Sequence, residues 1–173
     1  MAEQGTAEAA RALVIGRDEA KSYWQPVPAN GFVCNILNQQ TTGGAANFSL
    51  GTQTVAPQCF IREHTHAHQE EVIHVVEGRG IARIDGVEHA METGTTVYVG
   101  RGRKHHFLNP NDAPMTFVVM MIPGGLDQFF AEIGRERIPG QPAPEPFPRP
   151  ANIAEIEART VFGWTDKSYD QKK

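Results

Sequence analysis

A regular alternation of short apolar segments and turns, between residues 47 and 122, constrains the fold more than any other feature. The segments are rich in β-branched and aromatic side chains, which favour strands. Asp85-Gly86 separates two of them, and this dipeptide is typical of a type I′ hairpin turn because both turn positions need a positive φ. Short strands with turns at such regular intervals favour an antiparallel sandwich or a small barrel.

Ten segments are predicted to form strands. The first is a short edge strand, and the last is a continuous apolar run that predicts a strand buried on both faces. The Gly-rich stretch 38–45 is expected to be a loop, and the pattern over 18–25 leaves helix and strand open. The predicted strands cover residues 12–15, 32–37, 47–55, 59–66, 71–76, 79–84, 87–91, 95–99, 105–108 and 115–122.

The spacing of the apolar residues changes after residue 125. Apolar residues recur at helical spacing over 126–133, and Gly134 is placed to end that helix. Residues 139–150 hold six of the chain's twelve prolines and predict an extended strap. A second short helix is expected over 152–159, with Asn152 as its cap.

These segments predict one main domain with two appendages. Residues 1–10 are expected to be a flexible tail, and 11–137 a β-barrel domain with a docking helix. Residues 138–173 would supply the Pro-rich strap, a short helix and a charged tail. A chain of 173 residues is long enough for one full hydrophobic core and short for two.

The charge and composition of the chain argue against some classes of binding partner. The net charge of −4 gives no reason to expect nucleic acid or an anionic membrane surface, and the basic run 101–104 lacks interleaved aromatic residues. No apolar run approaches the roughly 20 residues of a membrane helix. The N-terminus lacks the basic and apolar regions of a secretory signal, so we expect a cytoplasmic protein with Cys34 and Cys59 as buried free thiols.

Three histidines and a glutamate form the candidate site. Alternate residues of a strand share a face, so His64 and His66 point the same way, together with Arg62. Glu71 follows on the next predicted strand and His105 on a later one. Three imidazoles and a carboxylate suit a divalent first-row metal ion. His66 with His68 is an alternative pair, although it leaves only two residues before Glu71.

The same alternation predicts which face of its strand each remaining side chain occupies. His74 and His106 are expected on faces opposite to the site, and His89 in a polar, solvent-facing hairpin strand. Apolar residues that share the inner face would form the walls of the barrel. These are Phe60, Ile73, Val75, Phe107, Phe117 and Met121.

The spacing of these residues resembles the two sequence motifs of the cupin superfamily. The first motif, Gly, His-x-His, Glu and Gly, corresponds to Gln58, His64, His66, Glu71 and Gly78. The second, Gly, Pro-x-Gly, His and Asn, corresponds to Gly94, Gly100, Gly102, His105 and Asn109. All four ligand positions match, and the two departures, Gln58 and Gly100, fall at turn positions.

The resemblance implies an all-β fold, a cupin jelly-roll β-barrel with short C-terminal helices. Thr42-Gly43-Gly44 and the stretch 123–130 look like the flanks of bacterial quercetin-dioxygenase-like cupins. The function so implied is a metal-dependent oxidoreductase, a dioxygenase acting on an enol, hydroxy-ketone or phenolic small molecule. The alternatives are a non-redox isomerase, lyase or decarboxylase, and a small-ligand-binding cupin without catalysis.

The resemblance also implies roles for individual residues. His64, His66, His105 and Glu71 would hold one divalent ion, Fe(II) in the first place and Mn, Ni or Zn as alternatives. Glu71 would also act as a base, and Arg62 would neutralise a substrate oxyanion. Cupins of this kind are commonly homodimers, and we expect such a contact to cover the apolar side chains of Phe147, Phe162 and Trp164.

Overall fold

Two antiparallel sheets enclose the core of the computed structural model, which describes residues 12–16, 18–44 and 47–164. The larger sheet contains β1 (Lys21–Trp24), β2 (Phe32–Asn38), β3 (Ser49–Val55), β5 (Glu70–Glu77), β8 (Thr96–Val99), β10 (Met115–Ile122) and β11 (Arg135–Glu136). The smaller sheet contains β4 (Cys59–Thr65), β6 (Arg79–Ile84), β7 (Val87–Glu92), β9 (His105–Asn109) and β12 (Gly163–Trp164).

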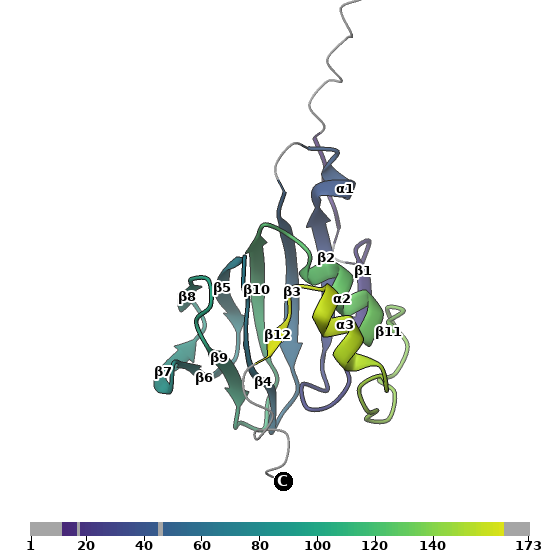
Figure 1. Ribbon diagram of the computed structural model, residues 1–173. Helices are drawn as coiled ribbons and strands as arrows, with labels where there is room; N and C mark the ends of the chain where they lie inside the picture. The colour runs from purple at the N-terminus through teal and green to yellow at the C-terminus, as the bar shows by residue number, and fades with distance from the viewer. Residues whose placement is uncertain (1–11, 17, 45–46, 165–173) are drawn as a thin grey trace, which may run out of the picture.

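The strand order follows a jelly-roll arrangement. The seven-stranded sheet runs β11-β1-β2-β3-β10-β5-β8, and the five-stranded sheet runs β12-β4-β9-β6-β7. Figure 1 shows the two helices α2 (Leu126–Ile133) and α3 (Ile153–Arg159) side by side next to the β1–β3 part of the larger sheet. The predicted all-β barrel with short C-terminal helices is confirmed.

The core forms because inward side chains alternate along each strand. On β10, the side chains of Met115, Phe117, Val119 and Met121 are buried. The residues between them are half-buried, and Ile122 is exposed. The prediction that this strand is buried on both faces is therefore wrong, because only its inner face packs against the core.

Most predicted strands are confirmed with small shifts at their ends, but the N-terminal part differs. Residues 12–15 form no strand, and the first strand is β1, which pairs with β2 and β11. The stretch predicted as a loop contains the short helix α1 (Gln39–Thr42). The Asn38 side chain accepts a hydrogen bond from Thr41 N at 2.7 Å and caps this helix. The predicted tail, residues 1–10, lies outside the described residues.

Turn residues adopt the backbone that their positions require. Asp85 and Gly86 have φ values of 47° and 85°, as the predicted hairpin turn between β6 and β7 needs. Gln58, at the glycine position of the first motif, also has a left-handed φ of 55°. A residue with a side chain therefore keeps the backbone shape that glycine adopts more easily.

The C-terminal third folds back onto the barrel. The Pro-rich strap 139–150 has no helix or strand, as predicted, and Val27 N donates a hydrogen bond to Phe147 O at 2.9 Å. The strap leads to α3, which packs against α2, and then to β12, which pairs with β4. Residues 138–164 are thus packed on the same core as the barrel. Among the residues described, no helix is long and apolar enough to cross a membrane.

Candidate metal centre

Four buried side chains converge between the two sheets: His64, His66, Glu71 and His105. One nitrogen or oxygen atom of each lies within 4.8 Å of the corresponding atom of every other. The exposed fraction of each residue is 4% or less. β4 and the residue after it supply the histidine pair, β9 supplies His105, and β5 of the opposite sheet supplies Glu71. The structure therefore brings together the four ligands that the sequence predicted.

Each imidazole is held by a backbone carbonyl at its Nδ1 atom. A carbonyl oxygen can only accept, so Nδ1 carries the hydrogen and Nε2 keeps the lone pair that binds a metal. The three hydrogen bonds run from His64 to Arg62 O at 2.8 Å, from His66 to Val161 O at 2.7 Å, and from His105 to Arg103 O at 2.9 Å.

Three of the nitrogen and oxygen atoms that face each other in this group lack hydrogen-bond partners. His66 Nε2, His105 Nε2 and Glu71 Oε2 are buried without a hydrogen bond. Glu71 Oε2 lies 3.2 Å from His105 Nε2 and 3.9 Å from His66 Nε2. Buried polar atoms are rarely left in this state, and a divalent cation among three imidazoles and a carboxylate would satisfy them. The residues present fit a metal ion.

The protonation states of three of the four groups agree with ligation. Burial lowers the pKa of His64 well below its ordinary value and also lowers the pKa of His66, so both rings are favoured in the neutral form that binds metals. Burial acts against ionisation of Glu71 and His105 too, but their contact outweighs it. The pKa of Glu71 is therefore lowered and that of His105 is raised, so a cation that binds His105 Nε2 displaces the proton that the contact with Glu71 favours there.

Phe162 is a site residue that the sequence reasoning missed. Its ring stacks on the His64 ring at 3.9 Å with an interplanar angle of 7°. It was expected to be exposed at a dimer contact, but Phe162 and Phe147 are both buried within the chain. That support for a dimer is therefore removed, and the side chain of Trp164 lies outside the described residues. The sequence signal for this segment is the pair of large apolar residues Phe162 and Trp164.

A β-bulge changes the predicted face of two residues on β4. The register with β9 shifts between Ile61 and His64, so strict alternation fails there. Ile61 packs into the core, whereas Phe60 is half-buried and contacts the His106 ring at 5.4 Å. Phe60 therefore lies outside the buried core that surrounds the cluster, although it lines a cleft next to Phe162. The other predicted wall residues, Ile73, Val75, Phe107, Phe117 and Met121, are buried in the core.

Arg62 is buried close to the site but is not among the converging ligands. Its guanidinium pairs with the carboxylate of Glu157 on α3, and its Cζ atom lies 4.7 Å from the centroid of the Phe162 ring. Phe162 in turn stacks on His64. The oxyanion-neutralising role of Arg62 stays a prediction.

The other histidines lie away from the cluster, as predicted. His68 is exposed, so the alternative pair of His66 with His68 is not formed. His74 is exposed and its Nδ1 lies 2.9 Å from Thr96 Oγ1. His89 is exposed, and His106 is buried on the face opposite to His105. Cys34 and Cys59 are free, as expected, but only half-buried.

Comparison with known proteins gives three informative matches. The chain is 26% identical over 111 residues to the tetracenomycin polyketide synthase protein TcmJ of Streptomyces glaucescens, covering 64% of this chain and 74% of that protein. The structure of the polyketide cyclase RemF from Streptomyces resistomycificus superimposes with a TM-score of 0.56 and 22% identity, over 65% of this chain and 80% of that chain.

The third match is the structure of a predicted oxalate decarboxylase from Thermotoga maritima. It has a TM-score of 0.57 and 16% identity, and the match covers 64% of this chain and 99% of that chain. At these identities the two structures show the fold alone. The family model of the cupin domain matches residues 51–121, which include all four converging ligands. Together with the jelly-roll fold and the cupin sequence motifs, these matches support placing the chain in the cupin superfamily.

Proposed function

We propose that this protein is a metal-dependent enzyme that moves protons, without redox chemistry, on an oxygenated organic substrate with an enolisable carbonyl. The observation that carries the proposal is the buried group of three imidazoles with inward Nε2 atoms beside the carboxylate of Glu71. The likeness to a polyketide synthase protein and to the fold of a polyketide cyclase supports a ketone-rich substrate, such as a poly-β-ketone.

His64, His66 and His105 would hold the metal ion, with Glu71 as the fourth ligand. When bound, such an ion supplies Lewis acidity that polarises a carbonyl oxygen and stabilises an enolate. The Nδ1 hydrogen bonds to backbone carbonyls fix the direction in which each ring presents its lone pair. The protein therefore prepares the donor set before a substrate arrives.

Glu71 is the group that would move the proton. Its pKa is held below the ordinary value against burial by the nearby His105, so it is a carboxylate at neutral pH. A carboxylate within reach of the carbon next to the carbonyl can take a proton from it and return the proton to another position. The apolar core around the site, with Phe107 and Phe117 in contact, excludes water that would compete for the proton.

Exchange of α-hydrogens for deuterium tests this proposal. Metal-loaded protein would be incubated without oxygen in D₂O with a panel of β-diketones and hydroxy-ketones, and NMR would follow the exchange. We expect metal-dependent exchange that Glu71→Gln slows by about 10²–10⁴-fold. Glu70→Gln is the matched control, because Glu70 is the preceding residue of β5, lies nearer the surface and pairs with Arg101. Protein that binds metal but exchanges no panel member contradicts the proposal.

A dioxygenase is the second candidate, and the donor set favours it as well. Three imidazoles and a carboxylate suit Fe(II), and this is the ion predicted from the sequence. The same panel, extended to flavonols, separates the two functions. Oxygen uptake that is stoichiometric with substrate loss in the Fe(II)-loaded protein supports the dioxygenase, and equal turnover in air and under nitrogen supports the non-redox enzyme.

A further inference from the structure

We infer that Phe162 occupies a subsite for a planar aromatic ring of the substrate, and that residues 160–164 form a lid that moves away to admit it. The inference rests on the proposed function, because it names the class of substrate for the same site. The substrate would be an aryl or fused-ring compound with a ketone or phenol oxygen next to the ring.

The ring of Phe162 lies in a slot between two other rings. On one side it stacks on His64 at 3.9 Å and 7°, and on the other it stacks on Phe129 at 4.6 Å and 9°. The walls of the slot therefore come from β4 and α2 and not from the lid. Such a slot fits a flat conjugated ring, since parallel aromatic surfaces at these distances favour stacking. A ring stacked on His64 would also lie beside the metal ligands.

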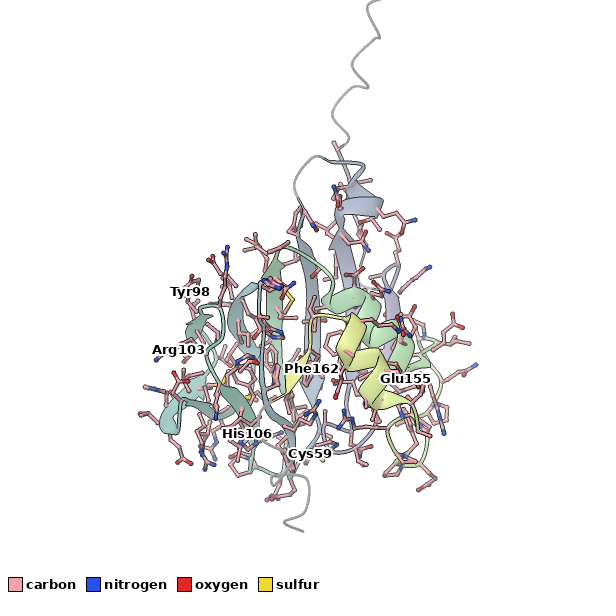
Figure 2. All side chains as sticks on the ribbon, viewed as in Figure 1. Cys59, Tyr98, Arg103, His106, Glu155 and Phe162 are labelled. Carbon is pink, nitrogen blue, oxygen red and sulfur yellow. The ribbon has the colours of Figure 1, made fainter. Side chains whose placement is uncertain are left out.

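The lid closes the site. All four converging side chains are almost completely buried, so a substrate needs an opening to reach them. Figure 2 shows Phe162 beside β12 and Glu155 on the neighbouring helix α3. The segment that carries Phe162 packs directly on the ligand cluster, because Phe162 stacks on His64 and Val161 O accepts a hydrogen bond from His66 Nδ1.

Few hydrogen bonds between strands hold the lid. β12 has two residues and pairs with β4 alone, at Thr65 and His64, in the part of the chain that the structure describes. The hydrogen bond from His66 Nδ1 to Val161 O also holds the lid against the barrel. Moving β5 or β9 would instead break a sheet on two sides, because each pairs with two neighbours. The lid therefore has fewer strand hydrogen bonds to break than β5 or β9, which carry Glu71 and His105.

A small cleft beside Phe162 would extend the space that its ring vacates. It encloses about 40 Å³, and Phe162 forms part of its wall together with Phe129, Phe130 and Ile133. Gln25 and Arg62 also line it and offer hydrogen-bond donors for oxygen substituents. When Phe162 leaves its slot, the cleft and the exposed face of His64 become one continuous cavity.

The test measures equilibrium binding of 1,8-dihydroxyanthraquinone to the Zn-loaded full-length protein by absorbance titration. If the lid is open in about a tenth of the molecules, removing the Phe162 ring raises the apparent affinity about tenfold. We expect this gain in Phe162→Ala. Phe147→Ala is the matched control, since Phe147 is equally buried in the C-terminal third and contacts Arg135 instead of the site. Unchanged or weaker binding in Phe162→Ala overturns the inference.

A second variant tests the slot itself. Adding Phe129→Leu to Phe162→Ala removes one aromatic wall and keeps an apolar side chain in α2. We expect it to weaken anthraquinone binding about tenfold and to leave binding of acetylacetone, which has no ring, within twofold. Equal losses for both compounds would contradict a ring subsite.

Amide hydrogen exchange of the wild-type protein reports the lid directly. Saturation with the anthraquinone should speed exchange over residues 160–164, because the ligand displaces them. Slower exchange there would mean that Phe162 stays in place as a wall and would overturn the inference. The anthraquinone titrations measure binding and not catalysis, so they separate the two proposals. Tight binding without exchange of substrate α-hydrogens refutes the proposed function alone. Exchange of substrate α-hydrogens without the gain in affinity in Phe162→Ala refutes this inference alone.

Discussion

Single side chains determine whether the site can hold an ion. Each of the three imidazoles is oriented through Nδ1, and two of the three accepting carbonyls lie only two residues earlier in the chain, at Arg62 and Arg103. The third belongs to Val161, far along the chain. The ligand geometry is therefore set partly by the strand itself and partly by the lid.

Replacing a ligand should remove the metal. We expect His64→Ala and His105→Ala to lower the metal content to about a tenth of the wild type or less, because each removes one of four donors from a buried site. His68→Ala and His74→Ala are matched controls with exposed histidines and should keep one ion per chain. Elemental analysis of the purified proteins measures this, and unchanged content in both ligand variants would rule out the site.

Asn109 illustrates a motif residue with a structural role. Its Nδ2 atom lies 3.1 Å from the carbonyl oxygens of Val55 and Ala56 and 2.8 Å from that of Ala113. Asn109→Ala leaves buried carbonyls unsatisfied and should lower the free energy of unfolding by about 2–3 kcal/mol. Urea denaturation measures the loss. The metal content should stay unchanged, and a loss of metal with unchanged stability would contradict this role.

At the scale of elements, α3 is attached to the barrel by a buried ionic contact. The carboxylate of Glu157 pairs with Arg62 of β4 and with Arg149 of the Pro-rich strap. Glu157 and Arg62 are 3% and 7% exposed. This contact fixes the helix that precedes the lid, so the position of Phe162 depends on it.

Glu157→Ala should destabilise the protein by about 3 kcal/mol, because it leaves Arg62 charged and buried without that carboxylate. Glu155→Ala is the matched control on the same helix, where the side chain is exposed, and should change stability by less than about 0.5 kcal/mol. Thermal and urea unfolding of both variants measure the difference. Equal effects would show that the buried ion pair does not hold α3.

The sequence predicts local features well where a single period governs them. The strands, the hairpin at Asp85-Gly86 and the ligand set follow from alternation and motif spacing. The burial of Ile61 in the core in place of Phe60 does not follow from alternation, because a β-bulge adds a residue that alternation cannot predict. The burial of Phe147 and Phe162 depends on how the C-terminal third folds back, which is a tertiary event without a local signal.

At the scale of the whole molecule, the candidate metal centre joins the two sheets. Three ligands come from the five-stranded sheet and its edge, and Glu71 comes from the seven-stranded sheet. A bound ion would add a link between layers that also meet through apolar packing and through the hydrogen bond from Asn109 to Val55 O. The homodimer stays a prediction, and the mass in solution by light scattering tests it.

Metal removal should therefore lower global stability. Ligand linkage predicts a loss of about 4 kcal/mol when the ion is removed from a protein held at 1,000 times its Kd. Thermal unfolding with and without a chelator measures the difference. His105→Ala is the control, since a variant without the site should unfold at the same temperature under both conditions. A chelator effect that persists in this variant would place the stabilising ion elsewhere.

The hydrogen bond from His66 to Val161 has a consequence for the order in which the site is completed during synthesis. A ribosome releases the chain from its N-terminus, so the strands that carry His64, His66, Glu71 and His105 emerge well before residue 161. Two imidazoles can be oriented at that stage by carbonyls two residues before them, whereas the His66 ring requires a carbonyl 95 residues later in the chain. Final ordering of the site is thereby delayed until residue 161 has left the ribosome.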